Sequence, residues 1–210
     1  MLRSLRLDVC LTLASCIAAC GPNVAPRTHV PAADLAAISG RFDDAAIRAQ
    51  VDELSGKLSI DGPEQVVLRE KLAALLEQPA FVAAMRERGV QAVGVYHWGE
   101  GGLVVKLARG SGTIRFAGVA GERSFDLEYT SIGAQVGGSA SWGVVLALGL
   151  SSVEAIEGSY TGDVASATAI DQSAGVMRLD HQGRSLYFVG VAEGLSANAG
   201  GGKMVLALRD

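Results

Sequence analysis

The chain has 210 residues, of which 49% are hydrophobic and only 19% charged, so it can bury a sizeable core in a single domain. Its 18 basic and 22 acidic residues give a formal charge of -4, and no basic excess favours nucleic acid as a partner. Three histidines supply little material for a metal site, and we expect neither a metal nor any other cofactor. The 27 glycines favour short strands joined by tight turns over a helical bundle.

The N-terminus has the pattern of a secretory signal. Arg3 and Arg6 precede an apolar run over 9–19. This run is about half of the roughly 20 residues that a transmembrane helix needs. We therefore predict a signal peptide over 1–19 that is removed from the mature protein.

All three cysteines lie within the first 20 residues. Small residues before a cysteine are typical of the site at which bacterial lipoproteins are cleaved and acylated. Residues 17–19 read Ile-Ala-Ala before Cys20, and residues 13–15 read Leu-Ala-Ser before Cys16. Cys20 is the predicted lipidated residue and Cys16 the alternative; a cleaved signal peptide without acylation is also left open.

An acylated Cys20 would attach the protein to a phospholipid membrane, since two or more acyl chains give stable anchoring. Gly21 follows Cys20 where an aspartate would indicate retention in the inner membrane, which favours the periplasmic side of the outer membrane. Prolines are frequent over 20–31, which predicts an extended tether. The folded domain is then expected over 32–210.

The first part of this domain has a helical pattern. Residues 32–57 carry apolar side chains three to five positions apart, as one face of a helix requires. Gly40 is expected to divide this stretch into a short helix and a longer one. Pro63 and Pro79 suit the first positions of two further helices, and Gly89 is expected to end the last.

From residue 91 onward the pattern changes to short apolar runs about ten residues apart, separated by Gly-containing turns. The predicted strands are 92–98, 103–108, 113–119, 124–129, 132–139, 142–148, 164–170, 175–179, 185–191 and 204–208.

We therefore predict an α+β fold, with N-terminal helices over 32–88 packed on a Gly-rich antiparallel β-sheet over 91–208. The regular spacing of the strands favours a small barrel, closed or partly open. Glycines inside the strands are expected to mark bulges or bends. They include Gly94, Gly133, Gly137 and Gly138.

Glycine-rich and apolar motifs follow one another in a definite order in this part. A Gly-Glu-Gly-Gly stretch begins at Gly99, Ile-Gly-Ala-Gln-Val-Gly-Gly-Ser begins at Ile132, and the apolar run Val-Val-Leu-Ala-Leu begins at Val144. In this order, residues 75–208 resemble the SYLF family, a lipid-binding domain of bacterial lipoproteins and eukaryotic membrane-remodelling proteins. The resemblance implies a lipid-binding function.

Motifs for catalysis are weak. Gly158–Gly162 contains a serine but not the Gly-x-Ser-x-Gly spacing of a nucleophile elbow. Gly200–Lys203 resembles a phosphate-binding loop, but Met204 stands where Ser or Thr is needed. His97 has no second histidine or cysteine near it in the sequence. We therefore expect a protein that is not an enzyme.

Four basic residues are candidates for contact with anionic lipid head groups: Arg86, Arg88, Lys106 and Arg109. A basic side chain near an anionic bilayer contributes about 1 kcal/mol. Glutamates interleave with these residues, so a mixed, solvated surface is the alternative. Gln135 lies in an apolar, Gly-flanked segment, where its amide either pins neighbouring strands or contacts a ligand.

These patterns favour a lipid-anchored envelope protein that binds phospholipid or a similar amphiphile without converting it. The expected mechanism combines the anchor at Cys20, a basic face and an apolar groove between helices and sheet. The alternative is a structural or interaction module of the envelope that binds a protein or a glycan.

Overall fold

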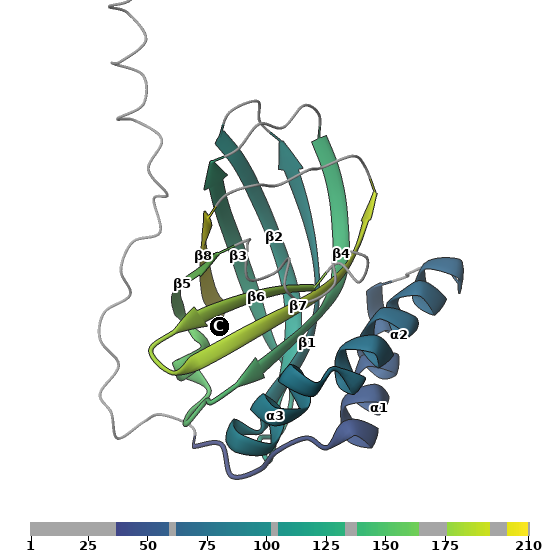
Figure 1. Ribbon diagram of the computed structural model, residues 1–210, viewed down its shortest axis with the longest axis vertical. Coiled ribbons are helices and arrows are strands. Elements are labelled where there is room, and N and C mark those ends of the chain that lie inside the picture. Colours follow the sequence, from purple (N-terminus) through teal and green to yellow (C-terminus); the bar gives the residue numbers. More distant parts are fainter. Residues whose placement is uncertain are drawn as a thin grey trace, which may run out of the picture. The chain divides into compact units, whose positions relative to one another are not determined.

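The computed structural model describes residues 37–58, 62–101, 105–132, 138–163, 176–193 and 201–209 (Figure 1). The predicted signal peptide, the tether, both candidate lipidation sites (Cys16 and Cys20), the predicted strand 164–170 and Gln135 lie outside these residues.

The described chain begins with helices and continues with strands. The helices are α1 (Asp44–Ser55), the short 3₁₀-helix η3 (Gly56–Leu58), α2 (Gly62–Glu77) and α3 (Pro79–Arg88). The strands are β1 (Val90–Gly101), β2 (Val105–Phe116), β3 (Arg123–Ile132), β4 (Gly138–Leu148), β5 (Gly158–Asp163), β6 (Val176–His181), β7 (Arg184–Glu193) and β8 (Gly201–Arg209). A second 3₁₀-helix, η4 (Glu154–Ile156), lies between β4 and β5.

The eight strands form a closed antiparallel barrel in the order β1-β2-β3-β8-β5-β6-β7-β4. Within this order β4-β1-β2-β3 and β8-β5-β6-β7 each have the arrangement of a Greek key, in which the fourth strand returns beside the first. Two successive Greek keys thus make the barrel, and the β3–β8 and β7–β4 pairings close it. The predicted α+β fold with a closed barrel agrees with this architecture.

The helical part differs from the prediction at its beginning. Helix α1 begins at Asp44, where the Asp43 side chain accepts a hydrogen bond from the Ala46 N–H at 2.8 Å. Before this cap, Ala37 and Phe42 form β-bridges with Ser152 and Val90 instead of a first helix. These bridges attach the segment to the barrel, an outcome that helix propensity could not reveal.

The later helix signals are confirmed. Pro63 lies at the start of α2 and Pro79 is the first residue of α3. Gly89 ends α3 with a φ of 74°, and its N–H donates to the Met85 carbonyl at 2.8 Å. This left-handed conformation suits a residue without a Cβ.

One pair of predicted strands is a single strand in the structure. Residues 105–108 and 113–116 of the predicted runs 103–108 and 113–119 belong to β2, because Gly110 and Gly112 continue the ladder instead of forming a turn. The predicted run 132–139 covers the last residue of β3 and the first two residues of β4, with 133–137 outside the described residues, and the run 142–148 lies in β4. Strand β5 was missed, because its sequence reads as a turn.

One apolar cluster lies inside the lumen of the barrel. Its fully buried members include Ile114, Phe125, Val145, Leu186 and Met204, each 0% exposed. Residues 32–210 form one compact unit that contains this core, so we expect this unit to fold as a domain.

A second apolar cluster covers the outer face of β1, β4 and β7. It joins Ile47, Val51 and Leu54 of α1 and Leu68, Leu72 and Leu75 of α2 to strand residues such as Val93, Val144 and Val189. Figure 1 shows the helices grouped along this side of the barrel. Two polar contacts reinforce the packing: Lys71 donates to the Gly190 carbonyl at 3.0 Å, and Arg88 donates to Ser185 Oγ at 2.7 Å.

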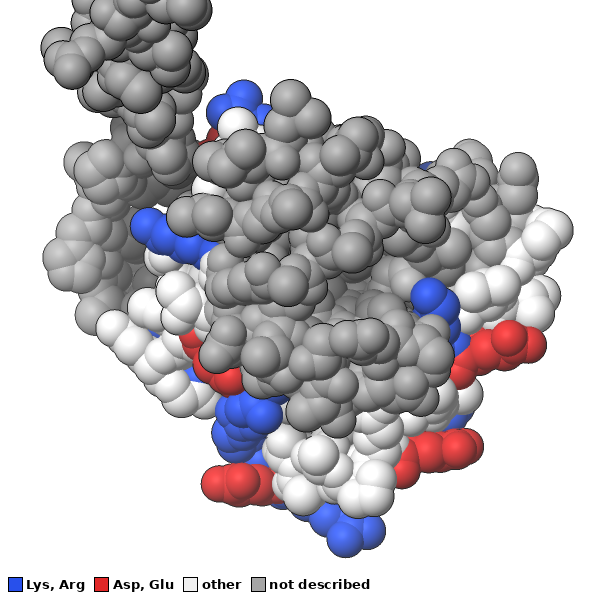
Figure 2. All heavy atoms as spheres, turned by 45° about the horizontal axis from the view of Figure 1, so that its top comes forward, with Lys and Arg blue, Asp and Glu red and all other residues white. Residues whose placement is uncertain are grey.

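The outer face of β2, β3 and β8 carries charged side chains in place of helices. Arg109 pairs with Glu128 at 3.2 Å, and Arg209 pairs with Asp126 at 3.2 Å. Apolar Phe125, Leu127 and Tyr129 alternate with these polar positions, as on a sheet with one face in water. In Figure 2 blue and red side chains of the described residues are interspersed on the face shown.

Glycines in the strands make room for aromatic rings. On β1, Tyr96 lies opposite Gly112 of β2 and Gly143 of β4, and Trp98 lies opposite Gly110. A Cβ at Gly112 would lie 2.4 Å from the Phe125 ring. The prediction that Gly94 marks a bulge is wrong, because Gly94 pairs in regular register with both β2 and β4. Gly138 is the first residue of β4, and Gly133 and Gly137 lie outside the described residues.

Gly112→Ala is expected to destabilise the fold by about 1–3 kcal/mol, because the new Cβ overpacks the lumen. The Cβ would also lie 2.2 Å from the Val95 carbonyl oxygen. Gly99→Ala is the matched control on the neighbouring strand, since nothing lies within 4 Å of its Cβ position. Urea denaturation of both variants measures the difference, and equal losses would contradict this role of glycine.

Candidate functional site

The described residues differ between the two ends of the barrel. We call the end at which β1 begins the closed end, because Leu150, Val153 and Ile156 pack into the lumen cluster there. Gln91 secures this end: its Oε1 accepts hydrogen bonds from the Gly149 and Leu150 N–H groups at 2.7 and 3.2 Å. Gln91 is 6% exposed, and its role was not predicted. The position of a polar residue at the start of an apolar strand was the sequence feature that could have indicated this role.

The opposite end, at which β1 finishes, we call the Trp98 end. Here four rings lie together: Tyr96 and Trp98 of β1, Tyr129 of β3 and Phe188 of β7. The Trp98 ring is stacked with those of Tyr129 and Phe188, with centroids 6.0 and 6.1 Å apart, and lies 5.2 Å from that of Tyr96. We call this group the aromatic cluster.

Glycines occupy two strand positions beside the aromatic cluster. Gly143 of β4 pairs with Gly190 of β7, and Gly143 also lies opposite Tyr96 of β1. A glycine has no side chain that could fill the lumen at these positions. The lumen of an eight-stranded barrel is wide enough to be filled by side chains or to hold one small ligand. The Trp98 end therefore has the composition of a ligand site.

One polar atom of the aromatic cluster lacks a partner. Trp98 Nε1 is buried and makes no hydrogen bond. An indole N–H is a donor only, and buried donors in folded proteins are nearly always paired. The described chain thus leaves a buried donor without a partner beside three aromatic rings.

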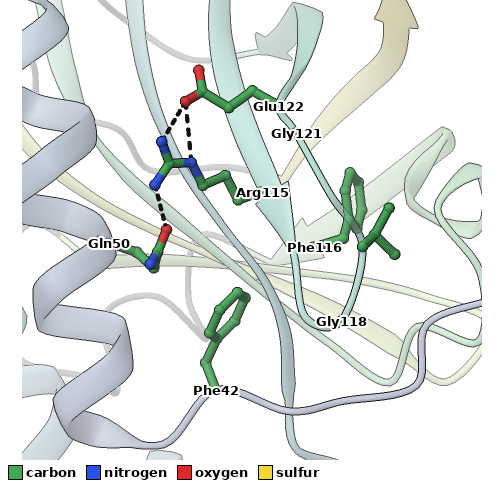
Figure 3. Close-up of a pocket in the computed structure, with 8 residues that line it drawn as sticks. Phe42, Gln50, Arg115, Phe116, Gly118, Gly121 and Glu122 are labelled. Carbon is green, nitrogen blue, oxygen red and sulfur yellow. Dashed lines mark hydrogen bonds and ion pairs between the residues drawn. The ribbon is translucent and has the colours of Figure 1, made fainter.

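A separate pocket lies on the surface between α1 and the β2–β3 turn, with a volume of about 370 Å³ (Figure 3). Apolar Phe42, Phe116 and Val119 line it together with Gln50, Arg115 and Glu122. Figure 3 shows Arg115 between Gln50 and Glu122, with hydrogen bonds to both.

The charges of this pocket neutralise one another. Arg115 donates to both carboxylate oxygens of Glu53 at 2.6 Å and to Glu122, which also accepts from Lys57. Lys57 and then Arg115 lower the pKa of Glu122, and Arg115 lowers that of Glu53. Glu53 and Glu122 are both paired with cations, and these ion pairs fasten α1 and η3 to the barrel.

The structure separates the basic residues predicted as one lipid-contacting face. Arg88 lies at the closed end, where it contacts Ser185 and the Gly183 carbonyl, and the exposed Arg86 precedes it on the same helix. Arg109 and Lys106 lie on β2 toward the Trp98 end, and Arg109 is paired with Glu128. The side chain of Lys106 lies outside the described residues.

The expected apolar groove between helices and sheet stays a prediction; the interface of α2 and α3 with the barrel is closely packed. Leu68, Leu75 and Phe81 fill this interface against the barrel and are at most 1% exposed. Among the described residues no group of three or more His, Cys, Asp or Glu is placed to hold a metal. None of the described helices is long and apolar enough to cross a membrane.

Comparison of the chain with protein-family models, curated proteins and solved structures found no match. The resemblance to the SYLF family therefore stays a prediction, and the geometry of the Trp98 end is the basis for a functional proposal.

Arg115→Gln is expected to destabilise the protein at pH 7, and the difference from wild type should shrink as the pH falls. The folded pKa values of Glu53 and Glu122 lie below the ordinary 4.5, so their stabilisation is present above that value and is lost as the pH falls through the folded values. In Arg115→Gln the pKa of Glu122 should remain partly lowered, because Lys57 still donates a hydrogen bond to this carboxylate.

The measurement is urea denaturation at pH 7 and pH 3. Arg109→Gln is the control, because its pair with Glu128 is formed by an arginine side chain that is 78% exposed, and such pairs contribute little. A difference between Arg115→Gln and wild type that grows toward pH 3 would contradict the assigned role.

Proposed function

We propose that this protein is a lipid-anchored protein of the bacterial cell envelope that binds a phospholipid or similar amphiphile without converting it. The ligand site is the Trp98 end of the barrel lumen. The observation that carries the proposal is the aromatic cluster beside paired small residues inside a closed barrel.

The physical basis is the burial of apolar surface. An alkyl chain in contact with aromatic rings leaves water, at roughly 0.8 kcal/mol for each buried methylene. Mouths of β-barrels are frequent places for such sites. The resemblance of residues 75–208 to a lipid-binding family and the predicted acylation of Cys20 are consistent with a ligand drawn from a membrane.

A binding role is also supported by what the described surface lacks. Arg115 is paired with Glu53, and Arg109 is paired with Glu128. The first of these pairs joins α1 to β2. We propose on these grounds that the protein is not an enzyme. It then acts by holding its ligand at the membrane to which Cys20 attaches it.

Cys20→Ser is expected to release the protein from membranes, because acylation needs the thiol of the new N-terminus. Cys16→Ser should leave membrane attachment unchanged. Fractionation of cells with labelled palmitate measures both. Loss of label only in Cys16→Ser would move the anchor to Cys16, and no label in the wild type would leave an ordinary signal peptide.

Ligand binding is expected to change the fluorescence of Trp98. The chain has two tryptophans, and Trp142 packs with the helix-covered outer face, so Trp142→Phe leaves Trp98 as the single reporter. Adding laurate or lysophosphatidylcholine to residues 21–210 of this variant should shift the emission saturably, with one ligand per chain. Trp98→Phe, which keeps Trp142, is the control and should show no shift.

An unchanged emission in both variants at all ligand concentrations would contradict lumen binding. The alternative of an envelope module for a protein or glycan partner would then be preferred.

A further inference from the structure

We infer that Trp98 selects the ligand by donating its indole N–H to a hydrogen-bond acceptor, so that the barrel takes an acyl compound with a carboxylate or ester oxygen. This inference rests on the proposed function, because it assigns the polar part of the same ligand. It makes Trp98 a specificity-determining residue in addition to a part of the apolar surface.

The first step is the state of the indole nitrogen. Nε1 is buried and unpaired, although the Trp98 ring itself packs against the lumen cluster. A donor in this state gains a full hydrogen bond from any acceptor that reaches it, without first breaking a bond inside the protein. A ligand that carries such an acceptor would supply the hydrogen bond that Trp98 Nε1 lacks.

The second step is what surrounds that nitrogen. The rings of Phe188, Tyr96 and Tyr129 lie within 6.1 Å of the Trp98 ring, centroid to centroid, and Gly110 faces Trp98 across the ladder. A ligand group without polar atoms that contacts these rings would leave the N–H unpaired. A carboxylate or ester oxygen accepts hydrogen bonds and satisfies it.

The third step compares ligands that carry an acceptor oxygen with ligands that carry an ammonium group. Aromatic rings also attract ammonium groups through their faces. An ammonium carries donors only, so it would lie beside Trp98 and still leave the indole N–H without a partner. The unpaired donor therefore favours an acyl head group over an amine of the same chain length.

The test uses residues 21–210 and three ligands with twelve-carbon chains: laurate, methyl laurate and dodecylammonium. Their affinities are measured by displacement of the fluorescent probe N-phenyl-1-naphthylamine. The wild type is expected to bind laurate and methyl laurate about five- to tenfold more tightly than dodecylammonium, the range of one added hydrogen bond. Methyl laurate is uncharged, so it separates hydrogen bonding from attraction between charges.

Trp98→Phe keeps a ring in the aromatic cluster and removes the N–H. We expect this variant to bind the probe and to lose the preference for laurate and methyl laurate. Trp142→Phe is the matched control and should keep the preference. In Trp142→Phe the single indole N–H resonance should also move downfield with laurate and methyl laurate and not with dodecylammonium.

The outcomes distinguish the two proposals. If neither the probe nor any of the three ligands binds the wild type, the proposed function fails. If they bind and the wild type shows no preference for the two acyl ligands, or prefers dodecylammonium, the inference fails while the proposed function stands. Retention of the preference by Trp98→Phe, with an indole resonance that does not move, overturns the inference as well.

Discussion

The fit between glycine and aromatic side chains inside the barrel is the constraint on which the rest of the structure depends. Tyr96 and Trp98 of β1 have glycines as cross-strand partners, and the Phe125 ring lies where a Cβ of Gly112 would be. Large and small residues thus interdigitate, as dense packing requires. The same complementarity keeps eight strands close enough to form one lumen, and it leaves the rings of the Trp98 end bordered by small residues.

The helices cover the apolar outer face of β1, β4 and β7. Residues such as Val144, Leu146 and Leu148 point away from the lumen and pack with the helices, while Val145 and Ala147 between them point inward. Residues 143–148 of β4 are therefore buried on both faces, and this part of the strand is continuously apolar. The β3 sequence alternates because only its inner face is covered. Helices cover β4, whose outward residues are apolar, and leave β3, whose outward residues are polar, uncovered.

These patterns explain how far the sequence could be interpreted. The helix boundaries at Pro63, Pro79 and Gly89 and a closed barrel were predictable, since they rest on local signals and on regular strand spacing. The Greek-key order, the continuous β2 and the bridges of 37–42 were not, because they depend on partners far along the chain. The Trp98 end was missed for the same reason: its rings come from β1, β3 and β7 and meet only in the folded barrel.

The position of β8 has a consequence for how the barrel is assembled. β8 lies between β3 and β5, so the last of the eight barrel strands in sequence order joins the first Greek key to the second. Until 201–209 is available, β3 and β5 present unpaired edges, which are prone to associate with other chains. Pairing over such a sequence separation is slow. If the predicted signal peptide directs export of an extended chain, this barrel is complete only after β8 has crossed the membrane.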